Sequence, residues 1–392
     1  MKNITRKYFS GLTKNSVLLA CASLFSDIST EMLYPILPVY LSQNLKASGS
    51  IIGIIEGVAQ AAQNVIQGLS GWLSDKWQKR KPIALFGYML SAVSKPLMGV
   101  FNGWPGVMGA RITDRLGAGS RAAPRDALIA GSVDEQYKGK AFGLEGIGDN
   151  MGGFLGPLLS ILLFFTLRIG IRSIFYLALI PGLLSAAMIL MVKERKVNQS
   201  AKSKLDLRLR NFPKKYWSYL LIIALFGLGN VSNSFLILQI KGNGLSLIHT
   251  ILVYAFYNLV AALISYPAGA LSDRYGRKPL LVISFVIFMI TYAGFAFTAN
   301  LIIAGFLFIF YGLFQGIFRS VGKTFAADFV PQHLRASSIG WYSTVVGVSG
   351  LVASVVAGLL WDQVSHAAVF LYGAFFSLVA ILCLLFFKSD NY

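Results

Sequence analysis

Charged residues are scarce in this sequence of 392 residues. Only 13% of its residues are Asp, Glu, Lys or Arg, and the acidic ones number 16. A soluble domain of this length needs far more polar surface to face water. The low charge content therefore excludes an ordinary soluble fold.

Residues that carry enzyme chemistry are equally few. The two cysteines, Cys21 and Cys383, both lie in apolar stretches, where a thiol packs as a small hydrophobic group. They form no disulfide framework, and the three histidines are too far apart in the sequence to complete a metal site. No phosphate-binding loop of the form GxxxxGK[ST] is present. We therefore expect no enzyme activity, no metal and no bound cofactor.

Long apolar runs make up most of the chain instead. Hydrophobic residues account for 55% of it, and the mean hydropathy is +0.64. A helix that crosses a bilayer needs about 20 consecutive apolar residues. The runs lack the strict alternation of membrane strands, so we expect an all-α membrane protein with twelve transmembrane helices. The predicted spans lie near 17–41, 49–73, 82–101, 106–128, 141–166, 170–192, 216–240, 246–271, 279–299, 301–325, 336–360 and 367–387.

Basic residues are sorted between the predicted loops. The net charge is +19; every second loop, together with the two ends of the chain, holds 24 Lys and Arg, whereas the other loops hold four. Basic loops stay on the cytoplasmic side of a membrane. We therefore expect both termini in the cytoplasm, a lipid bilayer as partner and no nucleic-acid partner.

One pattern occurs twice. The segment GWLSDKWQKRKP (71–82) recurs as GALSDRYGRKP (269–279), so that Asp75 and Asp273 are 198 residues apart. Arg121 and Arg319 share the same offset. A repeat of this size in a chain of apolar spans predicts two similar helical bundles. We expect an N-terminal bundle in 1–192, a basic cytoplasmic linker in 193–215 and a C-terminal bundle in 216–392.

Together, the twelve spans and the repeated motif resemble the major facilitator superfamily, and the resemblance covers the whole chain. The second motif copy fits the family pattern completely, whereas the first has Gln78 near the expected glycine and one inserted residue. The resemblance implies two six-helix bundles related by a pseudo-twofold axis and a multi-pass protein of the bacterial cytoplasmic (inner) membrane. It also implies alternating access and function as a monomer.

In this family the repeated loops gate the cytoplasmic side, where a carboxylate at a helix end approaches the N-terminus of a neighbouring helix. The simpler alternative is that Lys76 to Lys81 only anchor the topology. The gate residues implied are Asp75, Lys76, Arg80, Arg121, Arg125, Asp126, Asp273, Arg274, Arg277 and Arg319.

Ionisable residues inside the spans are the second strong signal. A charged side chain at the centre of a membrane helix costs roughly 2.5–3.5 kcal/mol even on lenient scales, so such residues face the protein interior or water. Asp27 and Glu31 lie four apart and share one helix face. Arginine does not release its proton, so carboxylates are the expected carriers. The candidates for proton coupling are Asp27, Glu31, Glu56, Glu145 and Asp149.

Polar residues of other types predict a central substrate cavity. Charged ones come from the first half, whereas amides and tyrosines come mainly from the second. Taken singly, each is more often a helix-packing residue than a ligand contact. Asp114 is predicted to pair with Arg111 or Arg115. The cavity candidates are Lys95, Arg111, Asp114, Arg115, Gln60, Asn64, Asn230, Asn233, Tyr257, Asn258, Tyr311 and Gln315.

Two further segments resemble motifs of the family. Arg111 to Gly117 resembles the fourth-helix motif associated with proton coupling, with Asp114 and Arg115 in place of the commoner Gln and Gly. The fifth span resembles the antiporter motif, although Ser160 and Ile161 replace its final glycine pair. The residues implied as a hinge are Gly152, Gly156 and Pro157, and ordinary glycine-mediated helix packing is the alternative.

These observations favour a secondary active transporter that works by alternating access and is driven by a proton gradient. We expect it to export amphiphilic small molecules, drugs or metabolites, as an antiporter. The alternative is a carboxylate-rich organic anion, such as a siderophore or an organic acid, which Lys95, Arg111 and Arg115 would favour. A channel or a scaffold would not require both a charged interior and two gates.

Overall fold

The computed structural model describes residues 11–77, 79–134, 137–194, 212–331 and 334–387. All regular elements in these ranges are helices, as the sequence predicts. Of the predicted linker 193–215, residues 195–211 lie outside the described part of the chain.

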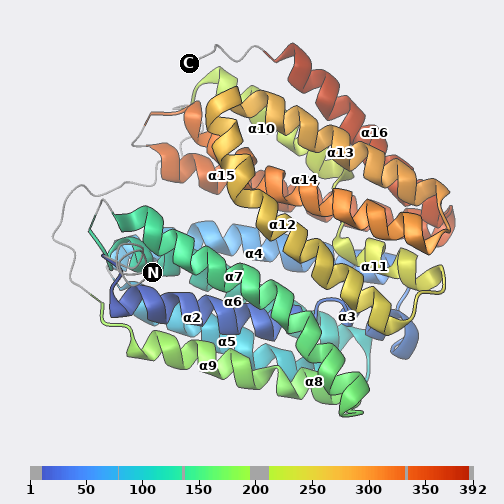
Figure 1. Ribbon diagram of the computed structural model, residues 1–392, viewed down its shortest axis with the longest axis horizontal. Coiled ribbons are helices and arrows are strands. Elements are labelled where there is room, and N and C mark those ends of the chain that lie inside the picture. The colour runs from blue at the N-terminus through green and yellow to red at the C-terminus, as the bar shows by residue number, and fades with distance from the viewer. Residues whose placement is uncertain (1–10, 78, 135–136, 195–211, 332–333, 388–392) are drawn as a thin grey trace, which may run out of the picture.

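The first half of the chain forms one lobe of helices (Figure 1). Its first pass across the bundle is interrupted after Glu31, and its fifth ends in a short wide turn. The elements are α2 (Lys14–Glu31), α3 (Leu37–Val39), η1 (Tyr40–Asn44), α4 (Gly49–Trp77), α5 (Arg80–Val100), α6 (Trp104–Ala130), α7 (Lys138–Ile161), η3 (Leu162–Thr166), α8 (Ile171–Leu177) and α9 (Leu179–Met191).

The second half forms the other lobe, which lies above the first in Figure 1. Its first pass is also interrupted, between Gly229 and Asn233. The elements are α10 (Lys214–Gly229), α11 (Asn233–Gly242), α12 (Leu247–Tyr275), α13 (Arg277–Phe297), α14 (Leu301–Asp328), α15 (Arg335–Gln363) and α16 (His366–Phe386).

Nine helical segments in the described ranges are long and apolar enough to cross a membrane. The first, second and fourth predicted spans are helical too, but they fall outside that group. The first is split into α2, α3 and η1, while α4 and α6 carry the polar and ionisable residues expected to face the interior. An all-α membrane fold is therefore confirmed, whereas the count of twelve spans stays a prediction.

Short connections place successive helices side by side. Only Gly276 separates α12 from α13, and its φ of 90° lies in the left-handed region that glycine adopts without strain. Thr13 caps α2 with its side chain, and Asn300 caps α14 by accepting from the backbone N–H groups of Ile302 and Ile303. Such caps fix where each helix begins.

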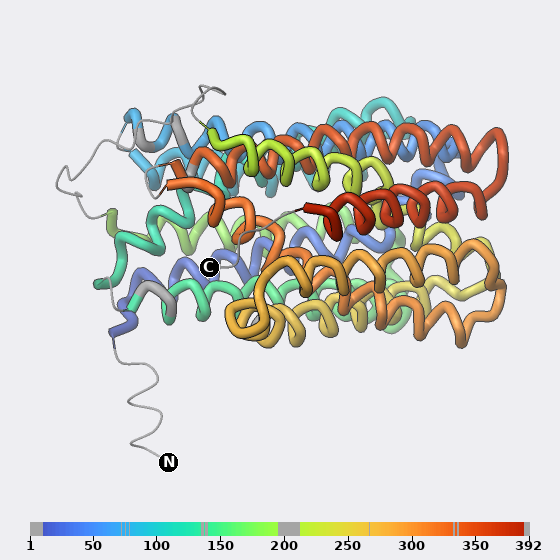
Figure 2. Tube along the Cα trace, turned by 90° about the horizontal axis from the view of Figure 1, so that it is seen from above, coloured from blue at the N-terminus to red at the C-terminus, as the bar shows by residue number. Residues whose placement is uncertain are grey.

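The two lobes meet along two antiparallel helix pairs. α4 packs against α15, and α7 packs against α12. The described chain begins at the left in Figures 1 and 2, and we call the end of the bundle where α2 begins the terminal face. The other end, with loops 45–48, 243–246 and 364–365, is the opposite face.

Apolar packing joins the lobes mainly toward the opposite face. One buried cluster there combines Leu41 and Phe175 of the first half with Leu238 and Ile251 of the second. Toward the terminal face, a cluster around Leu19 contains only first-half residues. The described lobes are thus closed together at the opposite face.

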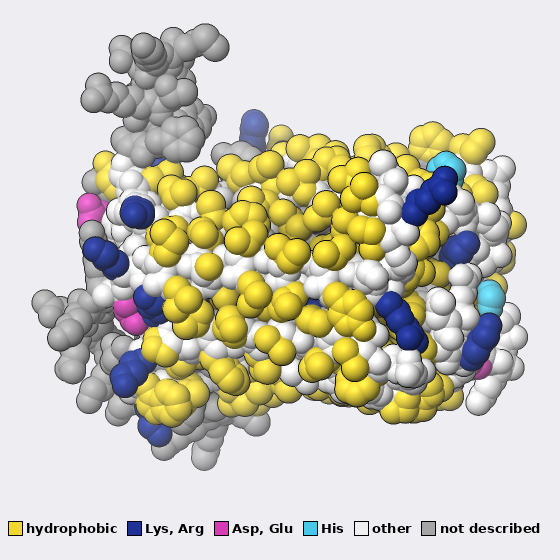
Figure 3. All heavy atoms as spheres, turned by 90° about the horizontal axis from the view of Figure 1, so that it is seen from below, with side chains coloured by type: hydrophobic (Ala, Val, Ile, Leu, Met, Phe, Trp, Pro, Cys, Tyr) yellow, Lys and Arg dark blue, Asp and Glu magenta, His cyan; other side chains and the backbone are white. Residues whose placement is uncertain are grey.

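The outer surface suits a bilayer. Hydrophobic side chains cover the middle of the face shown in Figure 3, and Lys and Arg gather near its two ends. Phe297 is 80% exposed and Phe86 is 60% exposed. In water such exposure would be unfavourable, whereas acyl chains accommodate it.

Candidate functional site

A buried network of charges occupies the core of the first lobe. Arg111 of α6 donates two hydrogen bonds to Glu56 of α4, with Nε–Oε1 at 3.0 Å and Nη2–Oε2 at 2.9 Å. Asp114, only 1% exposed, accepts from Arg115 at 2.7 and 3.0 Å and from Ser91 at 2.6 Å. The network joins three helices without exposing its charges to lipid.

Two more cations approach Asp114. Arg111 lies 3.4 Å from its carboxylate, and the Lys95 Nζ lies at the same distance. The predicted pairing of Asp114 is confirmed for both arginines, and Lys95 is an additional partner. Three cations thus face two carboxylates, and this mutual pairing is what makes burial of the charges tolerable.

A second ionic cluster lies nearer the terminal face. Arg125 of α6 contacts Glu145 of α7 at 2.8 Å, Asp149 at 3.6 Å and its neighbour Asp126 at 3.0 Å. The side chains of Asp126 and Asp149 are 45% and 42% exposed. Arg125 thus ties α6 to α7, and the gate role that the resemblance implies for Arg125 and Asp126 stays a prediction.

Arg121 lies between these clusters. Its guanidinium contacts the hydroxyl of Ser26, lies 3.9 Å from Asp27 and sits 4.7 Å from the centre of the Tyr88 ring. Asp27 is partly exposed, whereas Arg121 is buried. The described contacts of this predicted gate residue are therefore with α2 and α5, inside the lobe.

Glu31 lies where the two lobes meet. Its Oε2 accepts a hydrogen bond from the Tyr254 hydroxyl at 2.9 Å and a longer one from Asn258 at 3.5 Å. Asn258 also donates to the carbonyl of Gly153 at 3.4 Å, and the Tyr34 ring stacks on Tyr254 with centroids 5.4 Å apart. A carboxylate of the first lobe is thus held by polar groups of the second.

The second lobe contributes a wall of tyrosines and amides beside Glu31. The Tyr311 hydroxyl donates to Asn233 Oδ1 at 2.6 Å, and Asn233 Nδ2 donates to the Tyr257 hydroxyl at 3.2 Å. Gln315 also donates to Tyr257, at 3.4 Å. Four predicted cavity residues are therefore brought together, because the interruption between α10 and α11 places Asn233 beside α12 and α14.

The other predicted residues are dispersed around this centre. Gln60 is exposed on α4, Asn64 is buried against Gly347 of the other lobe, and Asn230 ends α10. Arg319 has an exposed side chain within electrostatic range of Glu31, as well as of Asp27 and Asp149. It is a predicted gate residue, yet it faces the central carboxylates.

The repeated loops differ in what they contact. In the second copy, Arg277 pairs with Asp328 of α14 at 2.5 Å and with Asp273 at 3.8 Å, and Arg274 lies over the Tyr275 ring. The first copy makes different contacts. Lys76 is exposed, Arg80 donates its backbone N–H to Glu194 at 2.8 Å and its guanidinium to the Ala127 carbonyl at 3.4 Å, and the side chain of Asp75 lies outside the described atoms.

The predicted hinge glycines mediate close helix packing. A Cβ at Gly152 would clash with Asp27 and the Leu24 carbonyl, and one at Gly156 would meet the backbone of Met32. Pro157 follows inside α7. These glycines let α7 approach α2 at the level of the proton-coupling candidates, which accounts for their presence without a hinge.

Asp362 is a contact residue that the sequence interpretation missed. Its carboxylate, near the end of α15, accepts from the backbone N–H of Gly49 at 2.8 Å and from that of Ser50 at 2.7 Å. The Ser50 hydroxyl adds a third bond at 2.6 Å. The partners are more than 300 positions apart in the sequence, so no local pattern could have paired them.

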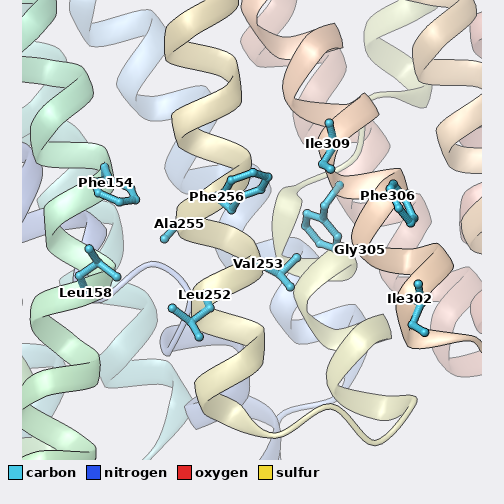
Figure 4. Close-up of a pocket in the computed structure, with 11 residues that line it drawn as sticks. Phe154, Leu158, Leu252, Val253, Ala255, Phe256, Ile302, Gly305, Phe306 and Ile309 are labelled. Atoms are coloured by element: carbon cyan, nitrogen blue, oxygen red, sulfur yellow. The ribbon is translucent and has the colours of Figure 1, made fainter.

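An apolar groove of about 520 Å³ lies between α7, α12 and α14 (Figure 4). Phe154, Phe256 and Phe306 line it together with aliphatic side chains, and its lining contains no charged residue. Its composition matches lipid chains, in contrast to the polar site around Glu31. Among the described residues, no group of three or more His, Cys, Asp or Glu is placed to hold a metal ion.

Comparison with known proteins gives consistent results. The family model of the Major Facilitator Superfamily matches residues 19–256 and 218–391. An uncharacterized MFS-type transporter of Methanocaldococcus jannaschii is 35% identical over 382 residues, which are 96% of this chain and 95% of that protein. A multi-drug resistance efflux pump of Streptococcus pneumoniae, PmrA, is 34% identical over 131 residues, which are 33% of each chain.

A solved structure shows the same fold. The nucleoside transporter NupG superposes with a TM-score of 0.80 at 16% identity, covering 97% of this chain and 100% of that one. With the helical lobes, the repeated loop motif and the buried charges, these similarities lead to one conclusion: the chain belongs to the major facilitator superfamily and is a multi-pass membrane transporter rather than an enzyme.

Proposed function

We propose that this transporter exports amphiphilic small molecules, drugs or metabolites, in exchange for protons by alternating access across the cytoplasmic membrane. One observation carries the proposal: Glu31 lies at the junction of the lobes and is held by Tyr254 and Asn258 of the other lobe. A carboxylate in that position can bind a proton, and its hydrogen bonds depend on how the two lobes are placed.

The packing supports an alternating mechanism. Buried apolar clusters close the lobes at the opposite face, while Asp149 and Arg319 retain exposed side chains in the interior. The terminal face is assigned to the cytoplasm because basic residues concentrate in its loops. On that assignment, the described state is closed to the outside, and its interior carboxylates exchange protons with the cytoplasm.

Proton exchange would act on Glu31 through its partners. Ionised Glu31 accepts hydrogen bonds from Tyr254 and Asn258, whereas the protonated acid is a weaker acceptor and loses its electrostatic attraction to Arg319. Protonation therefore weakens a contact between the lobes. Arginines such as Arg111 stay charged throughout and serve as fixed partners.

The second lobe favours an amphiphilic substrate. Tyr257 and Tyr311 present aromatic faces, and Asn233 and Gln315 add hydrogen-bonding groups beside them. Aromatic rings bury apolar parts of a ligand while a few polar groups fix its orientation. The name of the pneumococcal relative, a multi-drug resistance efflux pump, agrees with this substrate class.

An organic anion is the second candidate. Lys95, Arg111 and Arg115 outnumber the carboxylates of Glu56 and Asp114 in the buried network. The Arg115 side chain is 11% exposed, the most accessible of the three cations. A substrate carboxylate that reached Arg115 would balance the excess charge.

Transport in proteoliposomes tests the proposal. Vesicles with an imposed pH gradient are loaded with ethidium or with citrate, as probes of an amphiphile and of an organic anion. We expect ethidium movement driven by the gradient and its loss in Asp27→Asn or Glu31→Gln, with both variants still present in the membrane. Asp134→Asn, at an exposed loop position, serves as the matched carboxylate control.

The outcomes separate the candidates. Gradient-driven citrate movement without ethidium movement favours the anion alternative. Unchanged proton coupling in both carboxylate variants contradicts the assignment of Asp27 and Glu31. Counterflow, the exchange of labelled for unlabelled probe without a gradient, distinguishes a carrier from a channel.

A further inference from the structure

The contact between Asp362 and the start of α4 joins the two lobes at the opposite face. Asp362 belongs to α15 of the second lobe, and its three hydrogen bonds reach Gly49 and Ser50 of the first. They measure 2.6 to 2.8 Å. Three donors of one lobe thus converge on one carboxylate of the other.

The chemistry of this contact is that of a helix cap supplied from outside the helix. The first N–H groups of a helix have no partner within it, and the helix dipole favours a negative charge there. Here Asp362 supplies the carboxylate from the other lobe to the first two N–H groups, those of Gly49 and Ser50, while the Ser48 hydroxyl accepts from Ile51 at 3.4 Å within the first lobe. The partners of the first two N–H groups therefore depend on the lobes being together.

Close backbone contact surrounds the carboxylate. A Cβ at Gly358 would collide with the Gly49 carbonyl, and one at Gly53 would collide with the carbonyl of Ser354. Glycines on both helices thus let the backbones of α4 and α15 touch. Because hydrogen bonds weaken steeply with distance, a small separation of the lobes at this end breaks all three.

We propose that Asp362 is the latch of the opposite face: its carboxylate holds the N-terminus of α4 while the lobes are closed there and releases it when they open. The latch biases the equilibrium between the two states of the carrier. It goes beyond the proposed function, because it requires neither a particular substrate nor proton coupling.

The antiparallel pairing of α4 and α15 gives the latch a counterpart in the sequence. Asp75 stands near the C-terminal end of α4, the end adjacent to the start of α15. Asp362 stands near the C-terminal end of α15, adjacent to the start of α4. Each helix therefore has an acidic residue in its last turn, and Asp362 is the one whose contact with the start of the partner helix is described.

Distance measurements between spin labels test the latch directly. Labels are placed at Leu167→Cys and Phe297→Cys, two exposed positions of different lobes at the opposite face, in a full-length chain whose Cys21 and Cys383 are replaced by Ser. The protein is reconstituted in nanodiscs without substrate or gradient. The measured quantity is the population with a long distance between the labels.

We expect Asp362→Asn to raise the ratio of open to closed states about fivefold to tenfold, since it removes the charge of a three-donor cap. Ser50→Ala removes one bond and should raise the ratio about twofold. The double variant should match Asp362→Asn alone, because both changes break one contact. Gln363→Ala, an exposed neighbour, is the control and should leave the ratio unchanged.

An unchanged distance distribution in a well-folded Asp362→Asn protein overturns the latch. If that variant does not fold, Ser50→Ala and Asp362→Glu decide instead: displacing the charge by one methylene must also favour the open state. If transport is not driven by the pH gradient but the Asp362 variants shift the distances as expected, only the proposed function fails. If transport is driven by the gradient but the distances do not shift, only the latch fails.

Discussion

The two lobes share a repeated loop motif, yet their interiors differ in kind. The first lobe is built around ion pairs, in which Asp114 binds Lys95, Arg111 and Arg115. The second is built around rings, and Phe226, Phe285, Phe288 and their neighbours form one continuous aromatic cluster. A repeated arrangement of helices therefore does not fix the chemistry of the interior.

Equivalent positions make the difference concrete. At the offset of 198 residues that relates the two motifs, Glu56 corresponds to Tyr254 and Asp114 corresponds to Gly312. The charged residues of the first lobe pair with one another, and an aromatic or a small residue stands at the matching site of the second. We infer that the first lobe handles charge and the second handles shape and apolar contact.

The sharpest way to break this comparison is to remove Asp114. Asp114→Ala leaves Lys95, Arg111 and Arg115 buried with one carboxylate between them, so we expect a loss of about 3–5 kcal/mol in the free energy of unfolding. Thermal unfolding of the purified protein measures the effect. Adding Lys95→Met should restore part of the loss, and a loss below about 1 kcal/mol would show that the charges are not mutually dependent.

Packing at the seam between the lobes should be the next most sensitive feature. Gly358→Ala places a methyl group against the backbone of α4, so we expect a loss of about 1–3 kcal/mol. Gly350→Ala, on the same helix with open space at its Cβ, is the matched control and should be neutral or slightly stabilising. Equal melting temperatures for the two variants would contradict close contact at Gly358.

A hydroxyl in the second lobe should matter less than a charge in the first. Tyr311→Phe removes the donor to Asn233 and leaves its oxygen without that partner, which we expect to cost about 1 kcal/mol. The same variant should clearly reduce the rate of ethidium transport, even though its loss of unfolding free energy is small. Tyr88→Phe is the control, because the buried Tyr88 hydroxyl of the first lobe has no hydrogen-bond partner among the described residues, and it should not destabilise the protein.

The smallest effect is expected at the terminal face of the second lobe. The Asp273 side chain is 73% exposed and lies 3.8 Å from Arg277, so Asp273→Asn should change the unfolding free energy by no more than about 0.5 kcal/mol. A role in gating would appear instead as altered transport at unchanged stability. A large loss of stability would mean that Asp273 has a buried partner in another state.

Much of the fold could be predicted from the sequence. Apolar runs mark most helices because a bilayer admits only segments with satisfied backbone groups. The rule that interior charges need partners also predicted the pairing of Asp114 with its arginines, which α6 brings together at neighbouring helical positions. Composition and local spacing sufficed for these features.

The candidate site was less predictable. The described partners of Arg121 and Arg125 are on α2, α5 and α7, which no local pattern indicated, and their role at the first loop stays a prediction. The contact of Asp362 was not expected at all, because its partner, the start of α4, belongs to the other lobe. Sequence distance carries no information about which helix faces a given side chain across a bundle.

The amino-acid sequence by itself determined the membrane environment, the helical class, the twofold repeat and the set of ionisable residues inside the spans. These follow from solvation, since each is a matter of what lipid or water will accept locally. Tertiary structure alone decided that Glu31 meets Tyr254 and that Asp362 caps α4. Those contacts join residues hundreds of positions apart, so they exist only once the two lobes have packed together.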